Sequence, residues 1–574
     1  MNKEQQKDFS HRIVFLKSIL VLSAALMLLR LFIISVGQHS YYIAQAESQH
    51  GYYQKLIPTR GEIFISDKYS QKAYPIATNS KKDLVYIVPQ NISKPVDTAE
   101  TLARITTLDS QELLVKLSDQ SRKYVVIKKG LTEEESKAIA EAKLSGVFLD
   151  QENTRYYPEG QFLSQVLGFV GYKDNADEKT GLYGLEKYMQ KELAGIPGEI
   201  SADVSVNGAA IPGTQRQFTP AVDGTSLHLT IDRAIQFKAE TIIKETVQKH
   251  GADSGTIIVA DPKTGAILAM ANFPSFDPNE YNKAKSPSVY INGATTENYE
   301  PGSTMKTVTM ATGIDLGVVN PSTTYNDTGV VEVDGYKIKN SDGKAHGVVP
   351  MTKVIDESLN TGAIFVQKQI GNERFYQSLK NFGFGSATNI ELPEAIGNLN
   401  NLKGNITVNF YTAAFGQGIT VTPLQMLQSY LPLANKGKLM QPYIIHSKVL
   451  PDGTSIKTEP KMLREIVSEK TATLISGMLV DNVENGHGKQ AGVKGYYIGG
   501  KTGTAQVASG GVYVQNDNIG SFVGYGPTED PRFVMIVDVK RPRDVKFAES
   551  TAAPAFGKMA EFILGYYDIP PTRK

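Results

Sequence analysis

No cysteine occurs in this chain of 574 residues, and its 8 histidines are scattered, with no HExxH motif and no close pair. The missing cysteine excludes disulfides, thiol nucleophiles and cysteine-ligated metals. The histidine pattern argues against metal catalysis, and we expect neither a metal nor another cofactor. A GxSxG sequence is also absent, which leaves a serine–histidine hydrolase of the nucleophile-elbow type without support.

Charge of neither sign is in excess, because 60 lysines and arginines balance 59 aspartates and glutamates. This balance gives no electrostatic reason to expect a nucleic-acid partner. The length is too great for one core and predicts two to four domains.

One long apolar run is present, from Ile13 to Val36. Its length suits a helix that crosses a hydrocarbon layer of roughly 30 Å. Lys3, Lys7 and Arg12 precede the run, whereas basic residues after it are sparse until Lys55. The positive-inside rule therefore predicts a cytoplasmic tail over residues 1–12 and export of everything after the helix. A cleaved signal peptide with Ala44-Gln45-Ala46 as its cleavage site is the alternative, and it exports the same chain.

The exported part divides near Val222-Asp223-Gly224, a turn that precedes the strand-like SLHLTI. Residues 37–220 mix short strands with helices, such as a charged helix over 131–141, and contain no active-site constellation. Residues 221–574 alternate helical periodicity with strand pairs joined by hairpin-turn residues. An α+β fold follows, with an antiparallel sheet flanked by helices.

The tripeptide Lys-Thr-Gly occurs three times, at 179–181, 263–265 and 501–503. The first copy lies in a polar, charged stretch and the second in a hairpin turn, so we expect both to be loops. The third follows a strand-like approach with glycines on both sides of Lys501. Missing side chains let another backbone come close, so this copy suits a strand edge that accepts an extended peptide.

Tyr-Glu-Pro-Gly at 299–302 precedes a helical pattern that begins at Ser303. Ser303 and Lys306 are three residues apart and share one face of that helix. A lysine with a pKa of about 10.4 becomes a useful base near neutral pH only when burial and a second cation lower its pKa. Another Ser-x-x-Lys at 341–344 has turn composition and no following helix, so Ser303 is the preferred nucleophile.

A third element is Ser358-Leu359-Asn360, at a junction between a loop and a helix. Its serine and asparagine can point into one site. Ser-x-Asn is a very weak signal, since another copy stands at 205–207, and the plain structural interpretation of Ser358 is a helix cap.

The order of the three elements is the signature of penicillin-recognising acyl-serine enzymes. The chain resembles the class B penicillin-binding proteins, which are membrane-anchored peptidoglycan transpeptidases. Nearly the whole chain takes part in this resemblance, through YEPGSTMK, GGKTGTAQ, the LTID at 229–232, GQGITVTPLQ at 416–425 and Arg-Gly-Glu-Ile at 60–63. The stretch FISDKYSQKA after Ile63 departs from the family pattern. No glycosyltransferase-like region precedes residue 220, which argues against the bifunctional class.

The resemblance implies a transmembrane helix over 13–36, an elongated pedestal of the dimerisation type over 37–220 and a transpeptidase domain over 221–574. It also implies a role for each site residue. Ser303 is the nucleophile, Lys306 its base, Ser358 a proton relay and Asn360 a substrate and lysine ligand. Lys501, Thr502, Gly503 and Thr504 bind the substrate. Lys501 and Thr502 hold its terminal carboxylate, and the backbone N–H groups of Ser303 and Thr504 form the oxyanion hole.

The partners implied are the stem pentapeptide ending in D-Ala-D-Ala, beta-lactams and a membrane glycosyltransferase of the wall-synthesis complex. Two other classes share the motifs: a beta-lactam sensor or hydrolase, and an inactive scaffold. The pedestal argues against the first and the complete set of motif side chains against the second. The length and the C-terminal tail resemble the division type more than the elongation type.

Overall fold

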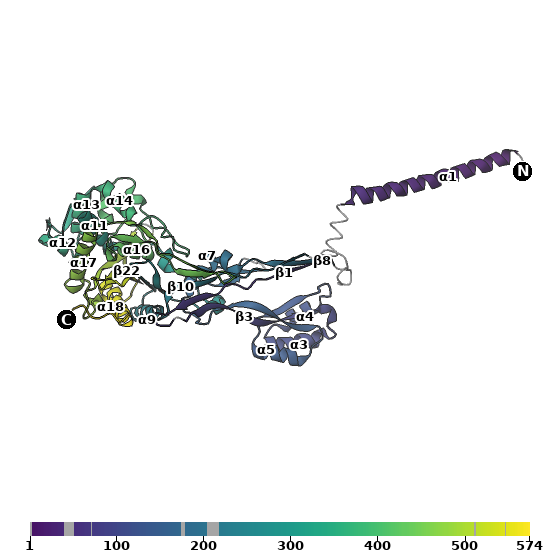
Figure 1. The fold of residues 1–574 in the computed structure, drawn as a ribbon, viewed down its shortest axis with the longest axis horizontal. Helices are drawn as coiled ribbons and strands as arrows, with labels where there is room; N and C mark the ends of the chain where they lie inside the picture. The colour runs from purple at the N-terminus through teal and green to yellow at the C-terminus, as the bar shows by residue number, and fades with distance from the viewer. Residues whose placement is uncertain are drawn as a thin grey trace. The chain divides into compact units, whose positions relative to one another are not determined.

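The computed structural model describes residues 3–39, 51–70, 72–173, 178–203, 217–509, 512–545 and 547–573. The chain forms two units (Figure 1). One contains residues 1–58 and 195–223, and the other contains residues 59–194 and 224–574. The cleavage site considered at 44–46 and the Ser-x-Asn at 205–207 lie outside the described residues.

The first unit begins with helix α1 (Lys3–Phe32), which continues as a π-helical turn over Ile33–Gly37. Its segment Ile13–Gly37 is long and apolar enough to cross a membrane, and no part of it is buried. The same unit contains an antiparallel sheet of three strands in the order β1 (Gly51–Leu56), β8 (Gly198–Asp203) and β9 (Gln217–Thr219).

The second unit contains a mixed sheet of seven strands, to which parts of the chain before and after residue 221 both contribute. Strand β10 runs parallel to β2, and the other pairs are antiparallel. The order is β19 (Ser455–Lys457), β18 (Ile445–Val449), β10 (Ser226–Asp232), β2 (Ile63–Ser66), β3 (Tyr74–Ile87) and β4 (Val125–Lys129), with β5 (Val147–Tyr156) also paired to β3.

Three helices cover one end of this sheet: α3 (Pro95–Thr106), α4 (Ser110–Ser118) and α5 (Glu133–Ala142). Helix α5 is the charged helix expected over 131–141. Thr132 caps it by accepting from the backbone N–H of Glu135, whose side chain bonds back to the Thr132 N–H. The apolar faces of these helices bury a separate small core with Val85 and Ile87 of β3.

A buried ion cluster explains the Arg-Gly-Glu-Ile sequence. Arg60 and Arg155 each donate to the fully buried carboxylate of Glu186 over 2.6 Å. Burial alone would raise the pKa of Glu186, but the two guanidinium groups hold that pKa below its ordinary value. Arg60, three residues before β2, therefore ties this part of the chain to the short helix α7 (Gly184–Tyr188), which is a structural role.

The first Lys-Thr-Gly is a strand and not the predicted loop. It forms β7 (Lys179–Gly181), paired with β6 (Val170–Tyr172). Gly181 is buried against the Glu186 carbonyl, and the Lys179 ammonium lies 3.4 Å from Glu152. Polar composition predicts exposure, but it does not reveal that a partner strand and a carboxylate lie nearby. The short helices α6 (Ser164–Leu167) and α8 (Gln190–Ala194) complete this region.

The catalytic part is built on an antiparallel sheet of five strands. Their order is β12 (Ile267–Phe273), β11 (Ser254–Ala260), β23 (Phe533–Lys540), β22 (Val512–Gly526) and β21 (Gly499–Ser509). The two predicted hairpins are its pairs β11–β12 and β22–β23. Lys501 lies on β21, an edge strand, as its flanking glycines predict.

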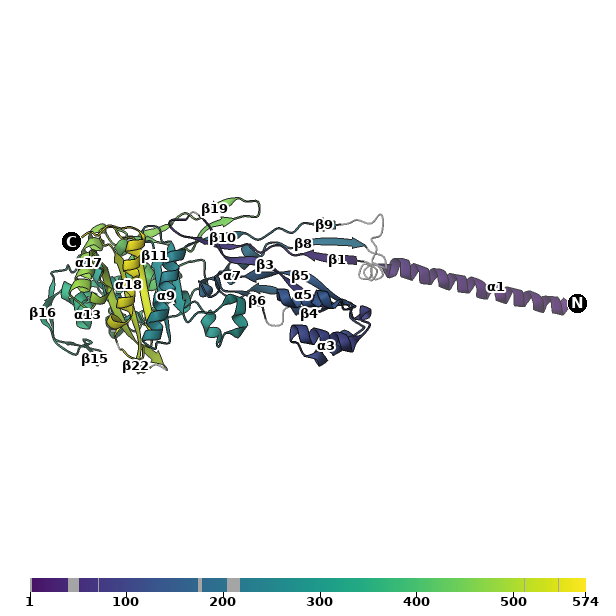
Figure 2. The ribbon, with the colours of Figure 1, turned by 90° about the horizontal axis from the view of Figure 1, so that it is seen from below.

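Both faces of the sheet are buried, because successive side chains of a strand point to opposite faces. Ile257 and Val259 of β11 face α9 (Arg233–Lys249) and α18 (Ala552–Tyr566), which lie side by side (Figures 1 and 2). Ile258 and Ala260 face the larger core on the other side. The helices of that core are α10 (Gly293–Thr296), α11 (Met305–Asp315), α12 (Met351–Asp356), α13 (Asn360–Ile370), α14 (Asn372–Asn381), α15 (Thr407–Ala413), α16 (Pro423–Ala434) and α17 (Glu469–Glu484).

Three further two-stranded pairs lie among these helices. They are β13 (Thr324–Asp327) with β16 (Gly347–Pro350), β14 (Val330–Val333) with β15 (Tyr336–Lys339), and β17 (Lys438–Met440) with β20 (Met462–Glu465). The α+β class and the helix-flanked antiparallel sheet expected from the sequence are confirmed.

Candidate active site

Ser303 lies in a single 3-10 turn, Gly302–Thr304, that runs directly into α11. Gly302 has φ +56°, and its N–H donates to the Gly416 carbonyl over 3.0 Å. A Cβ on Gly302 would stand 3.1 Å from the Thr504 carbonyl of β21. A glycine at this position therefore allows the start of the helix to press against the edge strand.

Lys306 lies in the first turn of α11, three residues after Ser303, and residues at this spacing share one face of a helix. Ser303 is partly exposed, whereas the Lys306 side chain is 1% exposed. The Lys306 Nζ donates to the Ser358 backbone carbonyl and, over 3.1 Å, to Ser358 Oγ. The helix thus presents an accessible hydroxyl and a buried amine on one face.

Ser358 is the point at which the three sequence elements meet. Its Oγ lies 3.1 Å from Lys306 Nζ and 3.1 Å from Lys501 Nζ. The residue is buried and has φ +54°, a backbone conformation that residues other than glycine rarely adopt. It does not cap α13, since that helix starts after Leu359 without a side-chain cap. The helix-cap interpretation of Ser358 is therefore wrong.

The pKa values of the two lysines are lowered to different extents. Burial, and then the charge of Lys501, lowers the pKa of Lys306 well below its ordinary value. Burial lowers the pKa of Lys501 to about 8, against the opposing charges of Asp356 and Glu549. Near neutral pH, Lys306 is therefore the amine that gives up its proton first, while Lys501 stays a cation.

Strand β21 packs tightly against the nucleophile helix. A Cβ on Gly503 would stand 2.5 Å from Ser521 Oγ and 2.9 Å from the Thr304 methyl group, so the residue must be small. Thr502 is mostly buried, with its hydroxyl 3.4 Å from Lys501 Nζ. Thr504 accepts from the Ala548 N–H over 3.4 Å. The strand places a cation and a hydroxyl beside the start of α11.

Asn360 lies next to this cluster but is engaged elsewhere. Its Nδ2 donates to the Lys339 carbonyl of β15 over 2.9 Å. In the part of the chain that the structure describes, it makes no hydrogen bond to Lys306. The lysine contact that the family resemblance implies for Asn360 is therefore absent from this arrangement.

Two features of the site escape sequence reasoning. One is Asp356, a buried carboxyl two residues before Ser358, whose pKa is raised to about 7 by burial and by Asp481. An acid inside a short apolar helix is the signal that could have shown it. The other is the pairing of Gly302 with Gly416, which depends on a contact across more than a hundred residues.

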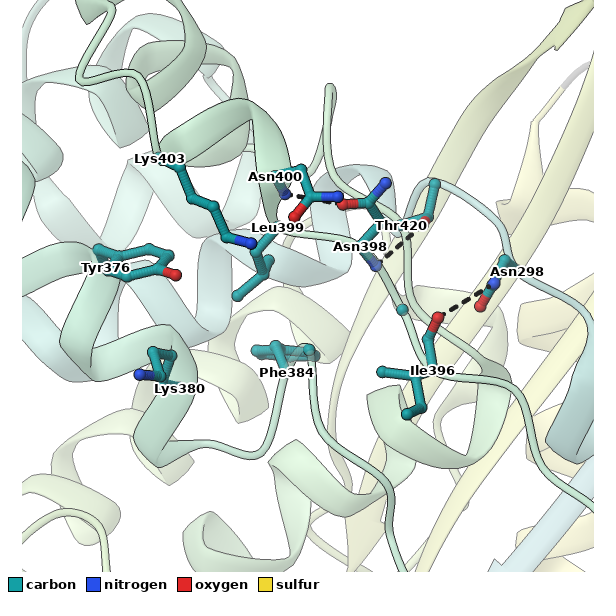
Figure 3. A pocket seen from close by; sticks show the side chains of 12 residues that line it. Asn298, Tyr376, Lys380, Phe384, Ile396, Asn398, Leu399, Asn400, Lys403 and Thr420 are labelled. Atoms are coloured by element: carbon teal, nitrogen blue, oxygen red, sulfur yellow. Dashed lines mark hydrogen bonds between the residues drawn. The ribbon is translucent and has the colours of Figure 1, made fainter.

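A hollow of about 540 Å³ lies apart from this cluster (Figure 3). Asn298, Asn398 and Asn400 contribute polar groups to it, and Lys403 and Tyr376 extend over it. It is lined by none of the eight motif residues. The cluster of Ser358 with its two lysines is therefore the candidate site of the chemistry. Among the described residues no group of three acidic or histidine side chains could hold a metal ion.

Comparison with known proteins decides the family. Residues 255–561 match the penicillin-binding protein transpeptidase domain, and residues 55–229 match the penicillin-binding protein dimerisation domain. The chain belongs to the class B penicillin-binding proteins. The family inferred from the motifs is thereby confirmed, together with its two-domain fold and its class of enzyme, the serine-type transpeptidases.

Relatives of this penicillin-binding protein cover most of its length. Stage V sporulation protein D of Bacillus subtilis is 33% identical over 524 residues, or 90% of this chain and 79% of that protein. Penicillin-binding protein PbpB of Mycolicibacterium smegmatis is 32% identical over 82% of this chain and 74% of its own.

Solved structures of penicillin-binding proteins and related enzymes have a similar fold. A peptidoglycan synthetase from Bifidobacterium adolescentis has 26% identity and a TM-score of 0.72, covering 91% of this chain and 98% of its own. Penicillin-binding protein 3 from Mycobacterium tuberculosis, in complex with aztreonam, has 25% identity and a TM-score of 0.69. It covers 90% of this chain and 98% of its own.

Proposed function

We propose that this penicillin-binding protein cross-links peptidoglycan as a D,D-transpeptidase, with Ser303 as its nucleophile. Ser303 Oγ attacks the carbonyl of the penultimate D-alanine of a stem pentapeptide, and its proton passes to neutral Lys306. An ester forms, the amide bond breaks, and the terminal D-alanine leaves with a proton relayed through Ser358. The amine of a second stem peptide then displaces Ser303 and forms the cross-link.

One observation carries the proposal: two buried lysines of unequal proton affinity share Ser358 Oγ, beside the helix that begins at Ser303. A general base has to be neutral at working pH, and burial next to a second cation lowers a lysine pKa in the required direction. Ser358 contacts both amines, so it can pass a proton between the base and the leaving nitrogen.

Binding of the substrate is assigned to strand β21. Lys501 and Thr502 are proposed to hold the terminal carboxylate, with Gly503 letting the strand lie close to the nucleophile helix. The N–H groups of Ser303 and Thr504 are proposed as the oxyanion hole, worth on the order of 3 kcal/mol per donor. Asn360 is proposed to bind the donor peptide's amide, for which its bond to Lys339 would have to exchange. A beta-lactam would acylate the same serine.

The test is the fate of a penicillin mixed with the purified full-length protein. A transpeptidase forms one long-lived acyl-enzyme and, with a pentapeptide substrate and an amine acceptor, releases D-alanine and forms cross-linked product. Steady hydrolysis of the penicillin would instead identify a hydrolase, and the absence of acylation would identify an inactive scaffold.

The apolar helix is proposed to anchor the protein in the membrane with residues 1–12 in the cytoplasm and the catalytic part outside. The basic residues before the helix support this orientation. We also propose the domain division at residues 220–221 and a membrane glycosyltransferase as partner, which would supply the glycan strands that are cross-linked. Reporters fused at residue 1 and at residue 574 should report the cytoplasm and the outside. A cytoplasmic C-terminus would overturn the topology and its substrate.

A role in septation is proposed over one in elongation, because residues 552–571 resemble the division type. Depletion of the protein should give filamentous cells if it serves the septum and round cells if it serves elongation.

A further inference from the structure

A buried polar network joins the start of α13 to residues 324–350, the segment between α11 and α12. The segment contains the strand pairs β13–β16 and β14–β15. At the centre of the network are Asp327, Asn340 and Thr361, and each is 4% exposed or less. Buried polar groups of this kind persist when their hydrogen bonds are satisfied.

The Asp327 carboxylate accepts four hydrogen bonds. Its Oδ1 accepts from Thr361 Oγ1 over 2.7 Å and from the Gly329 N–H over 2.9 Å. Its Oδ2 accepts from Asn340 Nδ2 over 2.8 Å and from the His346 N–H over 3.1 Å. Hydrogen bonds to an ionised acceptor are about twice as strong as neutral ones, so this carboxylate fixes the groups around it.

Asn340 extends the network to the backbone of α13. Its Oδ1 accepts from the Thr361 N–H over 3.2 Å, and its Nδ2 also donates to the Lys344 carbonyl over 3.1 Å. Asn340 immediately precedes the turn at 341–344, the second Ser-x-x-Lys of the sequence. That turn therefore has a use other than catalysis, since it orients the Asn340 side chain.

The neighbouring residue is held in the same way, because Asn360 Nδ2 donates to the Lys339 carbonyl. Two consecutive residues at the start of α13 are thus bound to two consecutive residues of the segment. Ser358 stands just before them with its uncommon φ of +54°. Such a backbone conformation persists only where the surrounding structure determines it.

We propose that Asp327 is a positioning residue for the acyl-transfer reaction. Through Thr361 and Asn340 it fixes the start of α13 and so holds Ser358 Oγ between Lys306 and Lys501. The inference rests on the proposed function of that site. Catalytic groups need to be held within about 0.5 Å of their working geometry, and a misplacement of roughly 1 Å can cost on the order of a hundred-fold in rate.

The experiment separates binding from chemistry in the full-length protein in detergent, using benzylpenicillin. For each variant, the dissociation constant of the non-covalent complex and the first-order acylation constant are measured, alongside thermal unfolding. Asp327→Asn and Thr361→Val should lower the acylation constant by at least about ten-fold and change the dissociation constant by less than about three-fold. Thr361→Ser keeps the hydroxyl and should retain about half of the parent rate or more.

Glu332→Gln is the matched control. Glu332 is an exposed acid on β14 of the same segment and pairs with Lys337 over 2.9 Å at the surface. The variant should acylate within about two-fold of the parent. A merely structural role of Asp327 would lower Tm and leave the acylation constant of the folded protein unchanged.

The adduct of the parent protein is mapped by mass spectrometry in the same experiment. Suppose that the adduct lies on Ser303 and that the folded variants Asp327→Asn and Thr361→Val acylate at the parent rate. This result would overturn the positioning role and leave the proposed function intact. If Asp327→Asn does not fold, the acylation constant of Thr361→Val tests the positioning role. A parent without an adduct on Ser303 would refute the proposed function and this role with it.

Discussion

Lys306 and Lys501, which come from a helix and from the edge strand of the sheet, direct their amines at one atom, Ser358 Oγ, from 3.1 Å each. Both side chains are buried, at 1% and 0% exposed. Burial, and then the charge of Lys501, lowers the pKa of Lys306 well below its ordinary value. This difference suits Lys306 to the proposed role of base and Lys501 to that of cation.

The pH dependence of acylation should have two limbs. Lys306 acts when neutral, so the second-order acylation constant should fall as pH drops through its lowered pKa. Lys501 acts as a cation, so the constant should also fall as pH rises through about 8. Lys501→Ala removes the repelling charge and should move the acid limb to higher pH, while the alkaline limb disappears. An acid limb that stays in place would show that Lys501 does not set the pKa of Lys306.

The three copies of Lys-Thr-Gly should respond differently to alanine substitution of their lysines. Lys501 is fully buried, and losing its charged hydrogen bonds should cost about 3 kcal/mol, a little over a hundred-fold in acylation. Lys263 is half exposed and pairs with Asp530, so Lys263→Ala should stay within about two-fold of the parent rate. Acylation rates with one penicillin and thermal unfolding would be measured for both.

Lys179→Ala extends this comparison, because Lys179 pairs with Glu152 on β5 of the seven-stranded sheet. It should also acylate at the parent rate. A folded Lys263→Ala protein as slow as Lys501→Ala would show that the wrong copy was chosen.

A buried acid behind the site predicts how stability changes with pH. Asp538 is fully buried on β23, and neither of its carboxyl oxygens has a hydrogen-bond partner among the described residues. Burial raises its pKa to about 8, against about 3.9 in an unfolded chain. The folded state therefore keeps a proton that the unfolded state loses. This contribution is complete below about pH 4 and is lost as pH rises through about 8, at ~1.4 kcal/mol per unit.

Asp538→Asn abolishes this titration, so its Tm relative to the parent should rise between pH 5 and pH 7. Asp342→Asn changes an exposed acid and should show no such trend. Parallel curves for Asp538→Asn and the parent would mean that Asp538 is ionised in the folded protein.

Local patterns predicted the parts of the site that depend on neighbours in sequence. The spacing of Ser303 and Lys306 fixes their shared face, and the glycines around Lys501 predict an edge strand. The turn residues of the two hairpins place β11–β12 and β22–β23. Each of these follows from backbone geometry over fewer than about ten residues.

The position of Ser358 could not be predicted in this way. Its contacts to Lys306 and Lys501 span 52 and 143 residues, and its φ of +54° is set by the packing around it. Asn340 could not be predicted for the same reason. In the sequence it looks like part of a turn, and its contact with Thr361 spans 21 residues. Composition likewise made Lys179 look like part of a loop, because sequence does not show which strand is available for pairing.

The most direct test of the account is the site of covalent labelling by a fluorescent penicillin. The adduct should map to the peptide that contains Ser303, and Ser303→Ala should abolish labelling while Tm stays within a few degrees, because one oxygen at the start of a helix is a small structural loss. Lys263→Ala in parallel should label as the parent does. Labelling that survives in Ser303→Ala, or an adduct on any other residue, would contradict the assignment of the nucleophile and the mechanism built on it.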